Sequence, residues 1–149
     1  MFQNFIGWEI LAPHNSFDSK TAILMDFRCD QSRGIHFIYL LPFSDCEALV
    51  ESTMFSLQRE PDTFFESAIN EYLYQHCEIH EFTTNRIEKG AIPLGRLPHL
   101  NDSHIGIGSN GGAIKPSSGY AFAFIQKQIS TMINTVKKNK SERNRFDPL

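Results

Sequence analysis

A glycine-rich segment, residues 104–124, carries the residue types and spacing that most directly suggest chemistry. Four glycines lie within residues 106–112, where the missing Cβ lets the backbone adopt unusual conformations and come close to a bound molecule. A long amphipathic helix is expected next, with Ser117 or Ser118 as its cap and free backbone amides that could hold an anion. The pattern predicts a site for a phosphorylated cofactor, with a plain strand-to-helix connection as the alternative.

Two carboxylic acids lie inside apolar segments that read as strands. Glu51 follows Ala-Leu-Val, and Asp26 follows Ile-Leu-Met. Burial in an apolar strand raises the pKa of a carboxyl group, so such a group could deliver a proton near neutral pH. The alternatives are an exposed strand position or an ion pair at the sheet edge for Glu51, and a structural anchor for Asp26.

The elements that must position these residues are predicted from hydrophobic periodicity. Strands are expected over residues 5–11, 21–28, 36–41 and 46–55, and their short connections favour an antiparallel meander. A further strand is predicted over residues 78–88, before a turn-rich stretch at 89–95. Glu88 is expected either to hold the turn before Pro93 or to have a functional role.

Two amphipathic helices complete the prediction. The first covers residues 63–75, where Thr63 and Glu66 have the spacing of a capping box. The second covers residues 118–138 and ends in lysines that complement the helix dipole. Each helix carries an apolar stripe that is expected to face a core. The stripes comprise Phe65, Ile69, Tyr72 and Leu73 in the first helix, and Ala121, Ile125, Ile129, Met132, Ile133 and Val136 in the second.

Composition excludes several classes of protein. The apolar fraction is 41% and the net charge is −3, which indicates a globular chain without a general attraction for nucleic acid. The three cysteines are odd in number and lack C-x-x-C spacing, so reduced thiols inside the cell and no metal site are expected. No apolar run approaches the ~20 residues that span a bilayer, so any membrane contact would be peripheral.

Read as a whole, residues 110–122 resemble the second flavin-binding motif of the FAD-dependent lycopene cyclases, G-G-x-x-(K/H)-P-(S/T)-T-G-Y. This chain has Ser118 where the family usually has threonine, which retains the hydroxyl group. In related flavoproteins the segment lies along the FAD pyrophosphate, ribityl chain and flavin. The resemblance therefore implies a set of cofactor-binding residues. They are Asn110, Gly111, Gly112, Lys115, Pro116, Ser117, Ser118, Gly119 and Tyr120.

Further segments occur in the order found in that family and cover nearly the whole chain. They begin at Gln3, Ala22, Phe37, Ala48 and Glu88. Glu51 resembles the acidic residue of the L-(V/I)-E-x-T segment of the bacterial-type cyclases, which is assigned acid/base work in cyclisation. Asp26 is a second candidate catalytic residue, either as an anchor of the structure or as a group that stabilises a cationic intermediate.

The fold implied by the resemblance is α/β, a partial FAD/NAD(P)-binding flavoprotein fold. Residues 1–100 would form an antiparallel substrate-domain sheet with one helix. Residues 101–149 would supply the closing strand and helix of the FAD-binding domain. Related enzymes bind the ADP part of FAD with G-x-G-x-x-G in an N-terminal βαβ unit, and no such unit is found in these residues. The chain therefore resembles the C-terminal portion of a cyclase.

The function implied is the conversion of linear lycopene to cyclic carotenes in carotenoid biosynthesis, by a cytoplasmic enzyme at the membrane surface. Reduced FAD would be a non-redox cofactor, with NAD(P)H as the reductant. Lycopene or a related linear carotene would be the substrate, and the N-terminal half would be a partner. Two alternatives stay open. The chain could belong to another isoprenoid-acting flavoprotein, such as a hydroxylase or reductase, or it could be a truncated, non-catalytic product or interaction module.

Overall fold

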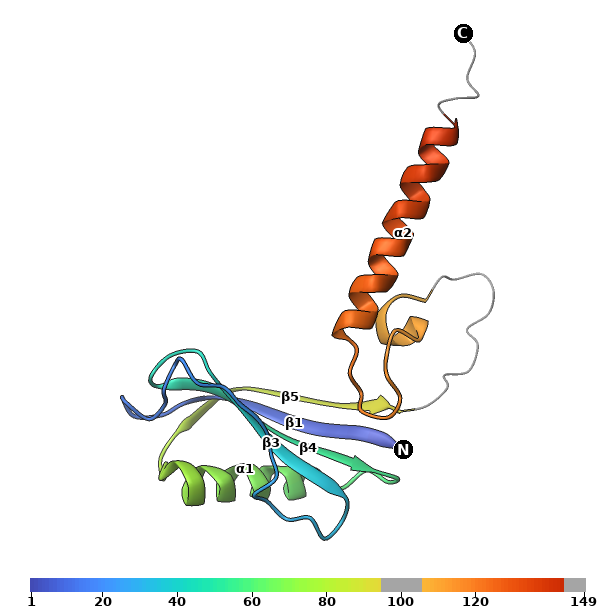
Figure 1. Ribbon diagram of the computed structural model, residues 1–149. Coiled ribbons are helices and arrows are strands. Elements are labelled where there is room, and N and C mark those ends of the chain that lie inside the picture. Colours follow the sequence, from blue (N-terminus) through green and yellow to red (C-terminus); the bar gives the residue numbers. More distant parts are fainter. Residues whose placement is uncertain (95–105, 144–149) are drawn as a thin grey trace. The chain divides into compact units, whose positions relative to one another are not determined.

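A five-stranded antiparallel sheet with a helix on one face makes up the first part of the chain (Figure 1). The computed structural model describes residues 1–94 and 106–143. The chain divides into two units, Met1–Pro93 and Leu94–Leu149. An α/β composition with an antiparallel sheet is confirmed, whereas the FAD-binding fold stays a prediction.

The strands are β1 (Phe2–Leu11), β2 (Ile23–Asp26), β3 (Ile35–Pro42), β4 (Glu47–Ser56) and β5 (Thr83–Pro93). Their order in the sheet is β2-β3-β4-β1-β5. The predicted meander is right for β2, β3 and β4. It is wrong for β1, which lies between β4 and β5, because β1 pairs over its full length with the equally long β4 and again with β5.

The fifth strand begins later and ends later than predicted. Helix α1 (Asp62–Cys77) closes at Glu78, which adopts a left-handed conformation with φ of 56°, so a strand cannot start there. The strand then continues through the stretch predicted to be turn-rich, because that stretch pairs with β1 as far as Phe2↔Pro93. Glu88 therefore lies within a strand and holds no turn.

Helix α1 begins at Asp62, after an N-cap at Pro61 that makes no side-chain capping bond. The predicted capping box of Thr63 and Glu66 is therefore wrong. The apolar stripe is confirmed, because Phe65, Ile69, Tyr72 and Leu73 are all buried.

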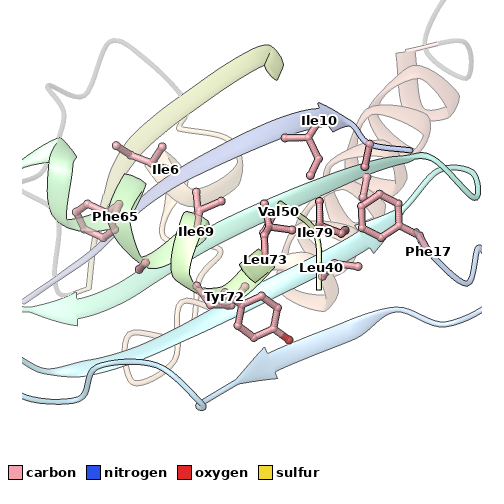
Figure 2. Packing of buried hydrophobic residues seen from close by; sticks show 14 of the residues in the cluster. Ile6, Ile10, Phe17, Leu40, Val50, Phe65, Ile69, Tyr72, Leu73 and Ile79 are labelled. Atoms are coloured by element: carbon pink, nitrogen blue, oxygen red, sulfur yellow. The ribbon is translucent and has the colours of Figure 1, made fainter. Parts of the chain in front are cut away.

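The two faces of the sheet differ because side chains alternate along each strand. The face that packs on α1, the core face, carries Ile6, Ile10, Leu40 and Val50, which surround the α1 stripe in Figure 2. The opposite face, here called the open face, has no helix of this unit packed against it (Figure 1). It carries the alternate residues of β1, β3, β4 and β5.

In the second unit, a short 3-10 helix η1 (Gly108–Gly111) leads through a turn to α2 (Phe122–Arg143). The predicted start of α2 at Ser118 is wrong, because Gly119 adopts a φ of 70° and its N–H bonds back to the Lys115 carbonyl. The predicted capping of α2 by Ser117 or Ser118 is therefore wrong as well.

Helix α2 exposes much of the apolar stripe that was expected to face a core. Among the residues that the structure describes, Ile129, Ile133 and Val136 are 38%, 48% and 65% exposed. The closing strand expected before the glycines lies partly outside the described residues, and Gly106 and Ile107 are not in a strand. Neither α1 nor α2, as far as they are described, is long and apolar enough to cross a membrane.

Candidate active site

Glu51 lies at the middle of β4, on the open face of the sheet. Its neighbours Val50 and Ser52 are fully buried on the core face, because side chains alternate along a strand. The Glu51 side chain is only partly buried, and its Oε1 accepts a 2.6 Å hydrogen bond from Thr53 Oγ1. Glu51 therefore points away from the helix, on the side of the sheet that α1 leaves uncovered.

A row of residues crosses the open face at the level of Glu51. Tyr39 on β3 pairs with Glu51, which pairs with Gly7 on β1, which in turn pairs with Glu88 on β5. Gly7 has no side chain, so two carboxyl groups face each other over the backbone of β1. A Cβ built on Gly7 would lie 3.3 Å from Glu88 Cγ and 3.6 Å from Glu51 Cβ.

Aromatic rings lie on the same face of β3 and β4. The Phe37 ring packs edge-on against Tyr39 and Phe55, with centroids 5.3 Å and 5.6 Å apart. On the other side of Glu51, the Phe5 ring covers Gly90, where a Cβ would lie 2.7 Å from the ring. Glu51 therefore shares the open face with aromatic rings and with the charged residues Glu9, Arg86 and Glu88.

The electrostatic setting of Glu51 favours its protonated form. Burial is the main cause that raises its pKa, the Thr53 hydroxyl opposes that shift, and the charge of Glu88 adds to it. Burial and the charge of Glu51 likewise raise the pKa of Tyr39. A partly buried acid retains its proton to higher pH than an exposed one, and this direction favours a proton donor.

Asp26, the second predicted catalytic residue, lies on the other side of the sheet. Arg28 Nη2 donates a 2.6 Å bond to Asp26 Oδ2, and Tyr72 of α1 donates a 2.7 Å bond to the same oxygen. The bonds from Arg28 hold the pKa of Asp26 well below its usual range. Asp26 and Glu51 therefore cannot act on the same reacting group within this unit, and the catalytic role of Asp26 stays a prediction.

A cleft of about 730 Å³ opens between α1 and the loop that follows β2. Its two arginines already have partners. Arg33 bonds Glu60 at 2.6 Å and Arg28 bonds Asp26 at 2.6 Å. Because its charges are paired and Glu51 lies on the opposite face, we do not place the chemistry in this cleft.

The glycine-rich turn of the second unit contains three glycines in the left-handed region, Gly108, Gly112 and Gly119. A Cβ at Gly108 or Gly112 would meet no atom of the chain within 4 Å. The backbone is therefore open at the Gly108 and Gly112 positions, which fits the close approach of a cofactor. Phe122 begins α2 shortly after the turn, and the first amides of a helix are suited to an anion such as a pyrophosphate.

Gly111 needs the absence of a Cβ for a different reason. A Cβ there would lie 2.2 Å from the Gly106 carbonyl oxygen, so the chain's own packing demands glycine. Gln128 of α2 holds the same turn, because Gly108 N–H donates a 2.8 Å bond to Gln128 Oε1. Sequence reasoning missed Gln128, because its role depends on a contact twenty residues away in the chain.

The remaining predicted cofactor residues lie on the surface of this turn. Lys115, Pro116, Ser117, Ser118 and Tyr120 are exposed. The Lys115 carbonyl accepts bonds from the N–H groups of Ser118 and Gly119, which closes the turn. Asn110 belongs to η1. The structure thus brings the predicted residues into one loop, and their contact with a cofactor stays a prediction.

Among the described residues, His14, Asp45 and Cys46 form a group of potential metal ligands, whose ligand atoms all lie within 4.8 Å of one another. His14 Nδ1 is 3.5 Å from Asp45 Oδ2, and its side chain is 86% exposed. Backbone bonds between the two loops, such as Ala12 N–H to the Cys46 carbonyl, hold the group together. We interpret it as a polar contact between two loops.

Comparison with known proteins gives concordant results. The profile of a family described as lycopene cyclase protein matches residues 1–147. A lycopene beta-cyclase of Pantoea ananas is 31% identical over 97 residues, which are 62% of this chain and 24% of that protein. A lycopene beta-cyclase of Paracoccus sp. is 30% identical over 138 residues, 83% of this chain and 33% of that protein. The chain thus spans a third or less of those relatives' length. No solved structure matches it.

Proposed function

The chain belongs to the lycopene cyclase family, and on that premise we propose that it cyclises a linear carotene with Glu51 as the proton donor. Both relatives are named lycopene beta-cyclase, which supports this substrate class. The observation that carries the proposal is the setting of Glu51. It is a carboxylic acid with a raised pKa, on the sheet face that α1 leaves uncovered, beside aromatic rings.

The reaction that we propose is an isomerisation. The Glu51 carboxyl group gives its proton to a terminal carbon–carbon double bond of the polyene, which leaves a carbocation. The electrons of a neighbouring double bond then form the new carbon–carbon bond that closes the ring. A proton leaves an adjacent ring carbon, and its return to the Glu51 carboxylate restores the acid, so no atom is gained or lost.

The surroundings of Glu51 suit the cationic intermediate. The Tyr39 ring lies on the same face as Glu51, and the face of an aromatic ring attracts a cation. The Thr53 hydroxyl bonds Glu51 and so orients the carboxyl group.

We propose reduced FAD as the cofactor, with NAD(P)H as its reductant. Asn110, Gly111, Gly112, Lys115, Pro116, Ser117, Ser118, Gly119 and Tyr120 would hold it. The open backbone at Gly112 supports this assignment. When bound, the electron-rich reduced flavin would stabilise positive charge electrostatically. We further propose that the ADP part of FAD is held by residues outside these 149, because the chain spans a third or less of its relatives.

The decisive experiment measures carotene formation from lycopene by the chain supplied with an ADP-binding half, in trans or by fusion, with flavin content measured in parallel. Glu51→Gln keeps shape and polarity but removes the acid, so it should lower the cyclisation rate on the order of a hundredfold or more. Glu51→Asp should be impaired less, because the carboxyl group retreats by one methylene. Near-normal turnover by Glu51→Gln would rule out Glu51 as the donor.

The cofactor assignment has its own test. Gly112 has a φ of 76°, a conformation that valine avoids and asparagine tolerates. Gly112→Val should abolish flavin retention in the completed enzyme. Gly112→Asn keeps the backbone conformation and adds a side chain on the open side, so it should still weaken retention if a cofactor approaches there. Flavin bound by both variants at wild-type stoichiometry would remove this turn from the cofactor site.

We also propose a peripheral location at the cytoplasmic surface of a membrane, because a linear carotene dissolves in lipid and not in water. The chain should sediment with phosphatidylglycerol vesicles that contain lycopene. An equal amount of chain in the supernatant with and without vesicles would contradict this location.

A further inference from the structure

Glu88 is the feature of the open face that the proposed reaction leaves without a role. It lies on β5, two strands away from Glu51, and both residues pair with Gly7 of the intervening β1. Resting on the proposed function of Glu51 as proton donor, we infer that Glu88, which faces Glu51 across Gly7, is a positioning residue whose negative charge opposes ionisation of the Glu51 carboxyl group.

The geometry depends on Gly7. Adjacent strands are about 4.8 Å apart, so the backbones of β4 and β5 are separated by roughly twice that distance, with β1 between them. Any side chain at position 7 would stand between the two carboxyl groups. A Cβ there would already be 3.1 Å from Leu49 Cδ1 and 3.3 Å from Glu88 Cγ. Glycine therefore leaves the space above β1 to the side chains of Glu51, Glu88 and Leu49.

The two acids differ in exposure and in partners. The Glu88 side chain is 41% exposed, and Arg86 Nη2 lies 3.8 Å from its Oε2. Glu51 is partly buried, and its hydrogen-bond donor among the described side chains is the neutral Thr53 hydroxyl. Burial disfavours the charged form of Glu51, and the negative charge of Glu88 acts in the same direction.

The other charged or titratable groups on this face do not cancel the interaction. Tyr39 on β3 is neutral near pH 7. Arg86 on β5 is 2.9 Å from Glu9 of β1 and 3.8 Å from Glu88, so its closer ion pair is with Glu9. The charge of Glu88 raises the pKa of Glu51 in addition to the larger effect of burial. The electrostatic effect of Glu88 on Glu51 thus agrees with the strand register, in which both residues pair with Gly7.

The inference is tested first without catalysis, by infrared spectroscopy of the chain as a function of pH. The carboxyl C=O band that disappears in Glu51→Gln belongs to Glu51, and it should persist to higher pH than the band of exposed glutamic acids. In Glu88→Gln the Glu51 band should disappear at lower pH, because a neighbouring negative charge is removed. Glu88→Asp, which retains the charge, should restore most of the wild-type titration.

Glu71→Gln is the matched control, because it removes one negative charge from the exposed side of α1, away from Glu51. It should leave the titration of the Glu51 band unchanged. A Glu51 band that titrates identically in wild type and Glu88→Gln would overturn the inference, as would an equal shift in Glu71→Gln. If Glu88 had only a structural role, the Glu51 band would either not shift in Glu88→Gln or shift equally in Glu71→Gln.

The second readout is the pH dependence of cyclisation by the completed, flavin-loaded enzyme. Glu88→Gln should move the alkaline limb of the kcat profile to lower pH and leave the rate on the acidic side and KM unchanged. An unmoved alkaline limb would contradict the inference. If the infrared titration shifts as expected while Glu51→Gln retains turnover, the carboxyl pair stands and the proposed donor role of Glu51 fails.

Discussion

The two faces of the sheet differ in the surroundings of their polar side chains. On the core face, His36 is fully buried, and its two ring nitrogens lie 2.8 Å from the Ser52 hydroxyl and from the Asp30 carbonyl. On the open face, Glu51 has one side-chain donor and a second acid facing it across Gly7. On the core face both His36 ring nitrogens have partners, whereas the buried Asn4 Oδ1 and Trp8 Nε1 have none among the described residues. The open face retains an acid in an unfavourable setting.

The core face therefore contributes most of the stability of the sheet unit, and the open face carries its candidate reactive group. Partnered polar groups contribute to the free energy of folding, whereas a partly buried acid near another acid costs stability and gains reactivity. The single tryptophan, Trp8, lies on β1 beside Phe82 with ring centroids 6.1 Å apart. Its fluorescence therefore reports unfolding of the sheet unit in each stability measurement below.

The largest expected effect on stability comes from the helix that covers the core face. Ile69 of α1 is fully buried, so Ile69→Ala should lower the free energy of unfolding by about 2–5 kcal/mol. Leu49→Ala on the open face removes a partly exposed side chain and should cost clearly less. Urea unfolding followed by Trp8 fluorescence measures both. Equal losses would show that the open face is packed as tightly as the core.

The next effect concerns the link between α1 and β2. Tyr72 is 2% exposed and donates its hydroxyl to the charged Asp26, so Tyr72→Phe should destabilise the unit by about 1.5–3 kcal/mol. Tyr74→Phe is the control, because Tyr74 is 62% exposed. If Tyr72→Phe unfolds at the wild-type urea concentration, the hydroxyl contributes nothing and Asp26 relies on Arg28 alone.

A third effect is the acid sensitivity of the core face. Burial lowers the pKa of His36 below its ordinary value of 6.5, so the unfolded chain binds a proton that the folded chain resists. The contribution of His36 to stability is therefore complete above pH 6.5 and falls as the pH drops below it. His36→Gln should flatten this decline, and His80→Gln, at an exposed site, should not. A wild-type decline preserved in His36→Gln would assign it to other groups.

The smallest effect is expected on the open face and has the opposite sign. The pKa of Glu51 is raised, so its ionisation is less favourable in the folded chain than in the unfolded chain. Stability is then lost as the pH rises above the ordinary value of 4.5. Glu51→Gln should thus be slightly more stable than wild type at neutral pH and nearly equal at pH 4. A variant less stable than wild type at neutral pH would contradict the comparison of the two faces.

Much of the unit could be predicted from local sequence. The apolar stripe of α1 follows from spacing of 3.6 residues per turn, and the direction of Glu51 follows from alternation in a strand flanked by Val50 and Ser52. Both patterns are periodic over a few residues, and burial on one side of an element produces them. The family resemblance likewise depended on local segments, and the family profile over residues 1–147 confirms it.

Other features depended on residues far apart in the chain. The place of β1 between β4 and β5, the pairing of Glu51 and Glu88 across Gly7, and the bond from Gly108 to Gln128 have no local signature. The periodicity of a strand determines which side chains share a face, but not which strand lies beside it. Partner choice is decided by long-range backbone pairing and packing. For that reason the sequence alone indicated an acid at Glu51, and only the tertiary structure revealed the second acid opposite it.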